Sequence, residues 1–211
     1  SRVTPTWKSL QIETAIMYQD LRRGGYKNVA NLVNFGREAF EMKRVSLVLT
    51  ALSAAITNGA VNYINETGTL PTDTSMGALS LYLHDISDGS APIAFGLNKY
   101  IQAAGNLTNV NTNKTDVEKG LWNKTGFIKD YAGVELIGYS GQKKFADNTT
   151  IVPDHVLFGA AGKVGNLDMR GELRVYETLD NNKEKIDIKM NGYTFGWALT
   201  DLAKAAKVVI A

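Results

Sequence analysis

The glycine-rich run at residues 159–165 is the stretch of this 211-residue chain whose residue types come nearest to a phosphate-binding loop. Such a loop needs Gly-x-x-x-x-Gly-Lys followed by Ser or Thr, because backbone amides cradle the phosphates and the hydroxyl holds magnesium. Here Val164 follows Lys163, and no convincing helix pattern opens after it. The run, which starts at Gly159 and ends at Gly165, therefore favours a flexible connector. A phosphate-binding enzyme using it stays a remote alternative.

The histidines offer little for metal binding or nucleophilic catalysis. His84 and His155 are the only two, and neither has a second histidine or a cysteine at metal-ligand spacing. The chain contains no cysteine, which excludes disulfides, thiolate metal sites and cysteine nucleophiles. The Gly-x-Ser-x-Gly turn of many serine hydrolases is also absent from the sequence. We therefore expect structural histidines, no cofactor, no metal and no enzymatic activity.

Carboxylates gather in the last third of the chain, where pairs of them could do acid–base work. Basic residues alternate with them in the same segment, which indicates a solvated or intersubunit charged face instead. The carboxylates are Glu172, Glu177, Asp180 and Asp187, and the basic residues are Arg174, Lys183, Lys185 and Lys189.

A long helical pattern without proline runs from residue 26 to residue 58. At ~1.5 Å per residue such a helix is roughly 45–50 Å long, whereas globular helices average ~11–12 residues. Gly36 inside it indicates close packing or a bend. A helix of this length acts as a spine, which suits proteins that tile surfaces and argues against a catalytic pocket.

The other expected elements follow from periodicity and turn residues. The first 25 residues form a lead-in with a short helix through Ile12, Ile16 and Met17. The middle of the chain predicts a helix at 71–87, a strand at 92–95, a helix at 97–104, an Asn/Thr loop at 105–115, a helix at 116–124 and a strand at 134–139. The last third predicts a half-buried β-hairpin from 170–179 and 185–190, period-two residues at 193–199, a helical turn at 201–206 and a strand at 208–210.

Composition limits the class of protein. The chain is 44% hydrophobic and 21% charged, with a net charge of +2, which is typical of a folded soluble protein. The charge is too balanced to indicate wholesale binding to nucleic acid or to an anionic membrane. No apolar run reaches the ~18–20 residues that cross a bilayer. The chain begins at Ser1 without a signal-peptide pattern, so we expect a processed or excised piece of a longer product.

The order of these elements is similar to that of the major capsid proteins of tailed bacteriophages, whose fold is shared with encapsulin shells. Three stretches carry the resemblance: the spine at 26–58, the segment at 126–137 that passes Gly133 into a strand, and 151–159 followed by 166–176 and the hairpin. The resemblance implies an α+β fold with a long spine helix, a mixed axial domain and long peripheral β-hairpin strands.

The resemblance also implies a domain organisation. Residues 1–58 would be the lead-in and spine of a peripheral domain, 59–165 an axial domain, and 166–192 a peripheral β-hairpin. Residues 193–211 would be return strands and a terminal helix turn that pack on the axial domain. The family's N-terminal arm and extended loop would be removed, lie upstream or be absent, because only about 25 residues precede the spine.

The function that the resemblance implies is self-assembly into the icosahedral shell of a tailed-phage head, with pentamers and hexamers around the genome. The candidate intersubunit contacts are Arg37, Glu41, Arg44, Glu172, Arg174, Glu177, Lys183, Lys185, Asp187 and Lys189. The candidate axis-proximal loop contains Asn106, Asn109, Asn111 and Asn113.

The implied partners are other copies of the chain, scaffolding, portal and decoration proteins, and DNA held nonspecifically through phosphate charge at the inner surface, with no membrane. The implied location is the virion capsid, after synthesis in the cytoplasm of a bacterial host. Two alternatives stay open beside the phosphate-binding enzyme. One is an encapsulin-type compartment shell that holds a cargo enzyme, and the other is a monomeric phage adaptor or completion protein.

Overall fold

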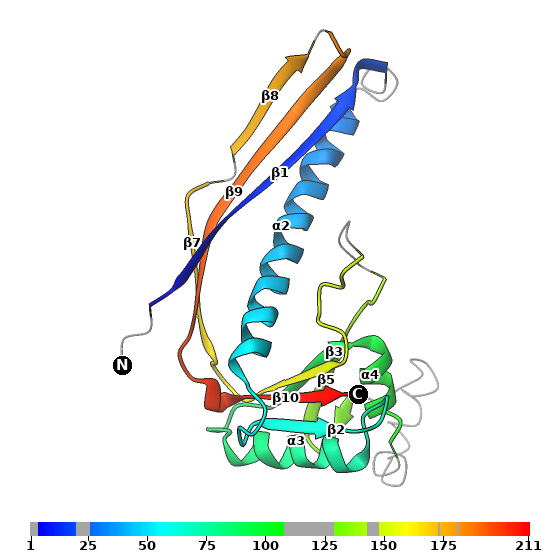
Figure 1. The fold of residues 1–211 in the computed structure, drawn as a ribbon, viewed down its shortest axis with the longest axis vertical. Coiled ribbons are helices and arrows are strands. Elements are labelled where there is room, and N and C mark those ends of the chain that lie inside the picture. The colour runs from blue at the N-terminus through cyan, green and yellow to red at the C-terminus, as the bar shows by residue number, and fades with distance from the viewer. Residues whose placement is uncertain (1–3, 20–25, 108–128, 143–147, 173, 181) are drawn as a thin grey trace. The chain divides into compact units, whose positions relative to one another are not determined.

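The computed structural model describes residues 4–19, 26–107, 129–142, 148–172, 174–180 and 182–211. Helices and strands both contribute, so the expected α+β class is confirmed (Figure 1). The chain divides into two compact units, one of residues 1–45 and 167–198 and the other of residues 46–166 and 199–211. These boundaries differ from those expected, because residues 46–58 belong to the second unit and residues 193–198 to the first.

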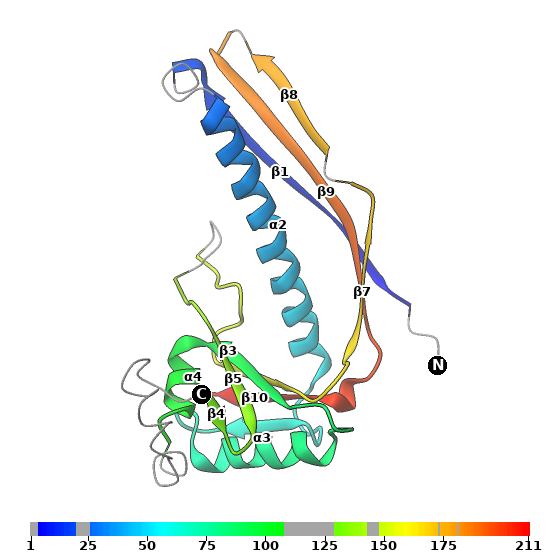
Figure 2. The same ribbon diagram turned by 180° about the vertical axis from the view of Figure 1, so that it is seen from behind.

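The first unit contains a four-stranded sheet and the start of the spine helix (Figures 1 and 2). The strands are β1 (Thr6–Met17), β7 (Gly165–Arg170), β8 (Arg174–Asp180) and β9 (Lys185–Leu199). β9 lies between β1 on one side and β7 and β8 on the other. The helix α2 (Tyr26–Ala55) has 30 residues, so it is about 45 Å long and confirms the expected spine.

The short helix expected near the N-terminus is wrong, because Thr6–Met17 is the strand β1. β1 forms an antiparallel ladder with β9 along nearly its whole length. The four-residue spacing of Ile12 and Ile16 fits a helix, but together with Leu10 these residues also fit a period of two. The local pattern fits a helix and a strand equally well. The segment is a strand because it forms a long ladder with β9.

The core of the first unit lies where α2 packs on the sheet. Phe40, Ile188 and Met190 are buried together there, and the partly buried side chains packed against them are Leu10, Ile12, Leu32 and Ile186. A Cβ atom added at Gly192 would lie 2.7 Å from Cε1 of Phe40. A Cβ atom at Gly36 would collide with Met190. Both glycines therefore permit a close approach of helix and strand, and the expectation of close packing at Gly36 is confirmed.

The second unit contains a six-stranded mixed sheet in the order β2-β10-β6-β3-β5-β4. The strands are β2 (Tyr63–Glu66), β3 (Ile93–Leu97), β4 (Asp130–Tyr131), β5 (Val134–Tyr139), β6 (Val156–Ala160) and β10 (Ala205–Ile210). β2 runs parallel to β10 and β3 parallel to β5, while the other pairs are antiparallel. The strands expected at 92–95 and 134–139 are confirmed as β3 and β5.

The helices α3 (Asp73–Asp85) and α4 (Asn98–Ala104) belong to this unit, and both match expected helices. Thr72 and Ser75 form a capping box at the start of α3. The buried side of α3 packs on the sheet where β6 carries Gly159, since a Cβ atom there would lie 2.8 Å from Leu79 and from Leu83. The short 3₁₀ helix Leu202–Lys204 matches the expected helical turn. None of the described helices is long and apolar enough to span a membrane.

Residues 159–165 are only in part the connector that the sequence indicated, because Gly159 lies in β6 and Gly165 begins β7, while residues 161–164 join the two strands. Gly159 lies in β6, which has a neighbouring strand on each side, and the amide of Ala161 donates to the carbonyl of Lys204 at 2.9 Å. Gly162 has a φ of +97° and turns the chain toward β7. A phosphate loop places its anion at a helix N-terminus, but here a strand follows the run.

A buried lysine meets the end of the spine helix. The last turn of α2 has no basic residue of its own. Instead, Nζ of Lys207 on β10 donates to the carbonyl oxygen of Ser53 at 2.7 Å and lies 5.1 Å from the centre of the Tyr63 ring. Burial lowers the pKa of Lys207. The sheet thus supplies the cation that favours the carbonyl end of a helix.

Candidate intersubunit surface

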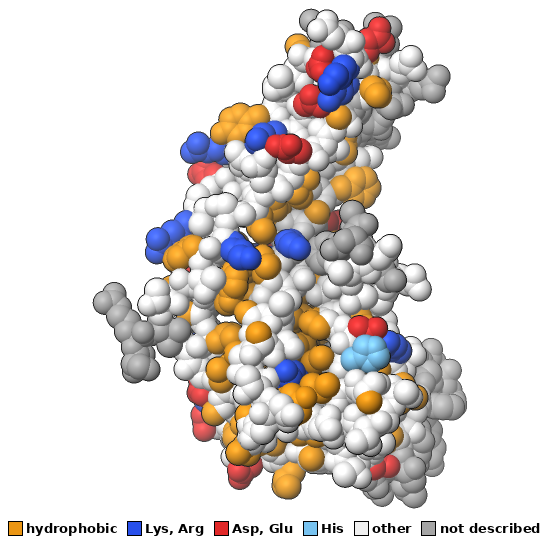
Figure 3. Space-filling model, viewed as in Figure 1, with side chains coloured by type: hydrophobic (Ala, Val, Ile, Leu, Met, Phe, Trp, Pro, Cys, Tyr) orange, Lys and Arg blue, Asp and Glu red, His pale blue; other side chains and the backbone are white. Residues whose placement is uncertain are grey.

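The outer face of the first unit's sheet is charged. On β9, Lys185, Asp187 and Lys189 alternate with the buried Ile188 and Met190, as expected for a strand with one solvated face. Figure 3 shows acidic and basic side chains intermingled over the surface that these strands form. The alternation therefore brings the predicted charges of this strand onto one surface.

Ion pairs organise these charges. Nζ of Lys189 lies 2.9 Å from Oε1 of Glu13, which faces it directly on β1. The hydrogen bond from Lys189 lowers the pKa of Glu13. Nζ of Lys185 lies 2.6 Å from Oδ1 of Asp187, and this hydrogen bond raises the pKa of Lys185. The Lys189–Glu13 pair is exposed, and exposed pairs contribute little to folding stability.

The three predicted contact residues on α2 differ in their surroundings. Arg37 and Glu41 are exposed. Arg44 forms an ion pair with Glu41, and its Nη1 donates to Sδ of Met169 on β7 at 2.9 Å. The structure therefore holds Arg44 against its own sheet, while Arg37 points to solvent.

The remaining predicted contact residues lie in the β8–β9 turn, on β8 and just before β8. The amide of Lys183 donates to the carbonyl oxygen of Asp180 at 3.3 Å and to its Oδ1 at 3.2 Å. Glu172, Arg174 and Glu177 are all exposed. The hairpin residues among the predicted contacts therefore share one sheet, β8–β9 and the segment that leads into it.

Strand β8 departs from the expected half-buried hairpin. Val175 is 40% exposed, Tyr176 47% and Leu179 66%, although Val175 and Leu179 lie opposite the inward-facing Met190 and Ile186 of β9. The hairpin is therefore half buried on β9 only. Periodicity shows which face a residue shares, but not whether another element covers that face.

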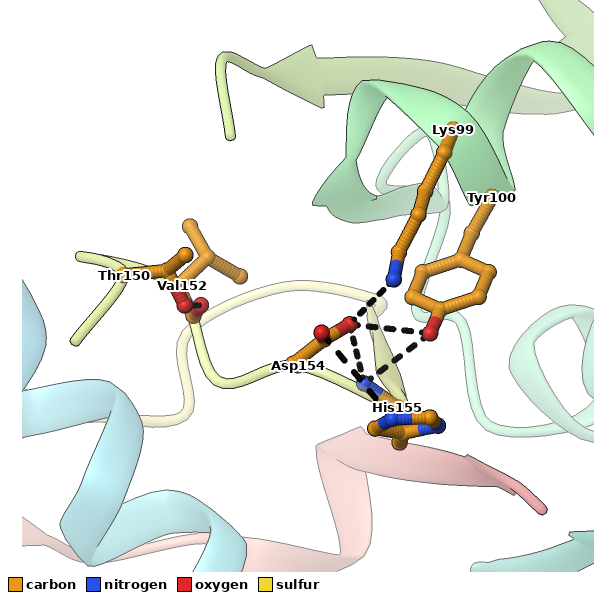
Figure 4. Close-up of polar contacts among 6 residues, drawn as sticks. All are labelled: Lys99, Tyr100, Thr150, Val152, Asp154 and His155. Atoms are coloured by element: carbon orange, nitrogen blue, oxygen red, sulfur yellow. Dashed lines mark hydrogen bonds and ion pairs between the residues drawn. The ribbon is translucent and has the colours of Figure 1, made fainter. Parts of the chain in front are cut away.

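A polar cluster lies in the second unit (Figure 4). One oxygen of Asp154 receives hydrogen bonds from Nζ of Lys99 at 2.7 Å, the Tyr100 hydroxyl at 2.9 Å and the His155 amide at 2.8 Å. Burial raises the pKa of Asp154, but these hydrogen bonds outweigh it and bring the pKa down to about 2. His155 has a φ of +60°, so the cluster fixes an unusual turn before β6. The ionised carboxylate of Asp154, with its donors in place, therefore holds the backbone of this turn.

An open groove lies next to this cluster, with a volume of about 740 Å³. It is lined by Ser46, Thr50, Ser53 and Ala54 of α2 and by residues of the segment 148–154. Its lining is mostly small hydroxyl and aliphatic side chains, and only Asp154 adds a charge.

The other residues with possible chemistry lie apart. Lys163 is exposed, and Nε2 of His84 lies 3.0 Å from the carbonyl oxygen of Ala132 at the β4–β5 turn. In the described part of the chain, no group of three or more His, Cys, Asp or Glu side chains could hold a metal ion. Asn106 is exposed just after α4, and its side chain donates to the carbonyl oxygen of Gln102 at 2.9 Å. Asn109, Asn111, Asn113, the rest of the Asn/Thr loop and the helix expected at 116–124 lie outside the described residues.

Comparisons with known proteins bear on the fold alone. No family model matches the chain, and no curated protein sequence matches it. A chain from Mycobacterium phage Bobi aligns with a TM-score of 0.64 at 10% identity, over 98% of this chain and 73% of that chain. The capsid of an empty GTA particle gives a TM-score of 0.62 at 13% identity, over 100% and 74% of the two chains. The holo-encapsulin complex from Synechococcus elongatus gives 0.58 at 13% identity, over 96% and 73%.

Proposed function

We propose that this chain, whose fold is that of the tailed-phage capsid proteins and encapsulins, self-assembles into the icosahedral shell of a tailed-bacteriophage head. The observation that carries the proposal is the likeness to shell-forming chains over nearly the whole length, both units included. Structural neighbours of this kind are shell components and not enzymes. The proposed role is therefore structural, with the genome enclosed inside the shell.

The proposal assigns a place to each unit. The first unit, with the charged sheet, would be the peripheral domain, and the second unit would be the axial domain around which five or six copies gather. The Asn/Thr loop after α4, from Asn106 through Asn113, would lie near the axis. Each contact can be weak, since a closed shell multiplies it. Scaffolding, portal and decoration proteins and the phosphates of packaged DNA would be further partners, and the virion capsid the location.

The decisive test is whether the protein forms shells. We expect negative-stain electron microscopy and sedimentation to show closed shells or five- and six-membered rings, for the 211 residues or for the full product of the gene. A monodisperse monomer from both, over a wide range of concentration and salt, would contradict the proposal and favour the adaptor function. Bound cargo enzyme in shells from the native source, with no nucleic acid, would favour the encapsulin alternative, which one of the structural neighbours supports.

Charge reversal tests the predicted contact residues. We expect Arg174→Glu combined with Lys185→Glu to reduce the assembled fraction several-fold at low salt, because like charges then face each other across subunits. Sedimentation velocity over a salt series measures the fraction. Lys163→Glu, which reverses a single charge at an exposed site of the second unit, is the control and is compared with Arg174→Glu alone as well as with the double variant. Unchanged assembly of the double variant would remove these residues from the contact.

A further inference from the structure

Strand β8, Arg174–Asp180, is one edge of the first unit's sheet, and β1 is the opposite edge. β8 pairs with β9 on one side, and no strand among the described residues pairs with its other side. Every residue from Arg174 to Leu179 is exposed. A free strand edge presents unpaired N–H and C=O groups and is a template for pairing with another chain.

The sequence of β8 is complementary to itself. It reads Arg-Val-Tyr-Glu-Thr-Leu-Asp. When two copies are laid antiparallel over all seven residues, Arg174 lies opposite Asp180 of the second copy. In the same register Val175 lies opposite Leu179. The ends of the strand then carry opposite charges, and the exposed apolar side chains meet each other.

We infer that two copies of this chain pair through their β8 strands, antiparallel across a two-fold axis that passes Glu177. A contact in which residue i meets residue j and j meets i is isologous, the arrangement that a two-fold axis requires. Tyr176 lies opposite Thr178 of the other copy, and Glu177 lies opposite itself. The inference rests on the proposed function, because the shell is what supplies the second copy.

The exposure of the apolar side chains supports a second copy as the occupant. Val175 and Leu179 share one face of the sheet, since they lie opposite Met190 and Ile186 of β9. Leu179 is the most exposed of the apolar side chains on β8, at 66%. Pairing with a second β8 covers both residues of each copy, and a shift of the register by two residues loses the Arg174–Asp180 match.

The contact is weak by itself. Seven residues of one strand fall well below the ~1,200–2,000 Å² that stable interfaces bury. Two Glu177 carboxylates placed directly opposite also repel each other. A weak two-fold contact suits a shell, since its closure multiplies every contact and weak contacts can still correct errors of assembly.

Disulfide trapping tests the pairing directly, because the natural chain contains no cysteine. In the inferred register, opposite Cα atoms lie about 4.5–5.5 Å apart, and each residue along a strand adds about 3.4 Å. A disulfide requires Cα atoms within about 7 Å. A cysteine at Glu177 therefore lies opposite the same cysteine of the second copy. Cysteines at Thr178 are displaced from each other by two residues along the strands, and cysteines at Val175 by four.

We expect non-reducing gels of oxidised protein to show dimer for Glu177→Cys and for the double variant Val175→Cys/Leu179→Cys. Val175→Cys, Thr178→Cys and Leu179→Cys alone should stay monomeric on the gel. Ala15→Cys, at an exposed site of β1, controls for random collisions. Equal cross-linking along the scan, or a maximum at another residue, would overturn the inference.

Microscopy of the same samples separates this inference from the proposed function. Shells that form without a cross-link at residue 177 would refute the β8 pairing and leave the shell function in place. A specific cross-link at residue 177, without shells at any protein concentration, would support the β8 pairing and contradict the shell function. As a second measurement, Glu177→Gln removes the central repulsion, so we expect roughly two- to five-fold more association at low salt. Glu135→Gln, which removes an exposed carboxylate of the second unit, should not increase association. No gain for Glu177→Gln would count against the register.

Discussion

Replacement of Phe40 by alanine is expected to unfold the first unit locally and to destabilise it by about 3–5 kcal/mol. Phe40 is 7% exposed and packs with Ile188 and Met190, and these three are the buried members of the unit's small cluster. Removing an aromatic ring from such a cluster loses the burial free energy of the ring and leaves a cavity. Because Gly192 already brings the strand against the ring, the backbone has little room to collapse further.

Hydrogen exchange is the measurement for this variant, since two units need not unfold together. We expect faster exchange of amides in β9 and unchanged exchange in β10. Phe35→Ala is the matched control, because Phe35 lies on the same helix but is 66% exposed. It should change stability by less than about 0.5 kcal/mol. Equal effects of the two variants, or equal effects on both units, would show that the cluster does not hold α2 to the sheet.

Replacement of Glu66 by glutamine is expected to destabilise the second unit by about 2–3 kcal/mol at neutral pH. Glu66 is buried at the end of β2, where Oε1 accepts from the amide of Gly68 at 3.0 Å. Oε2 accepts from the amide of Thr72 at 3.2 Å and from its hydroxyl at 2.5 Å. A glutamine amide replaces one of these acceptors with a donor, so at least one of the Gly68 and Thr72 donors loses its acceptor.

The pH dependence of stability gives a second readout for Glu66. Hydrogen bonds from Thr72, then from Ser75 and the amide of Gly68, lower the pKa of Glu66 from 4.5 to about 2. The folded state therefore binds the proton more weakly than the unfolded state does. The stabilisation that the Glu66 carboxylate contributes is complete above about pH 5 and is lost as the pH falls from about 5 toward 2.

Urea unfolding at several pH values tests this dependence. The natural chain should lose more stability between pH 5 and pH 2 than Glu66→Gln does, so that the two curves converge in acid. Glu135→Gln, at an exposed position of β5 in the same unit, should stay within about 0.5 kcal/mol of the natural chain. If the free energy of unfolding of Glu66→Gln and of the natural chain changed with pH in parallel, these hydrogen bonds would not lower the pKa of Glu66.

Local periodicity determined much of this protein from the sequence alone. The spine starts at Tyr26 as predicted, and β5 has its predicted bounds, Val134–Tyr139. Such elements need only their own pattern and their own turn residues, because the side-chain period sets both the structure and the buried face. The order of these elements was also enough to indicate the capsid fold, which the structural neighbours confirm. The lack of cysteine excluded disulfide and thiolate chemistry without any structure.

Tertiary structure decided what depends on neighbours that are distant in sequence. Residues Thr6–Met17 became a strand because β9 offered a long ladder, although Ile12 and Ile16 also fit a helix. Gly159 became part of a central strand because β10 and β3 pair with β6 on its two sides, whereas the residue type alone indicated a connector. A glycine is needed there because α3 packs where a side chain would stand. Lys207 is buried because the end of α2 offers it a carbonyl oxygen.

The candidate contact surface shows the same division. The sequence alone shows the alternation of Lys185, Asp187 and Lys189 with apolar residues, and this alternation predicts the solvated face of β9. The exposure of Val175 and Leu179 is not, because their pattern is that of a buried face. Only the folded sheet shows that β8 pairs with β9 on one side and with no described strand on the other. An edge is defined by the strands that lie next to it, and no single segment of sequence records them.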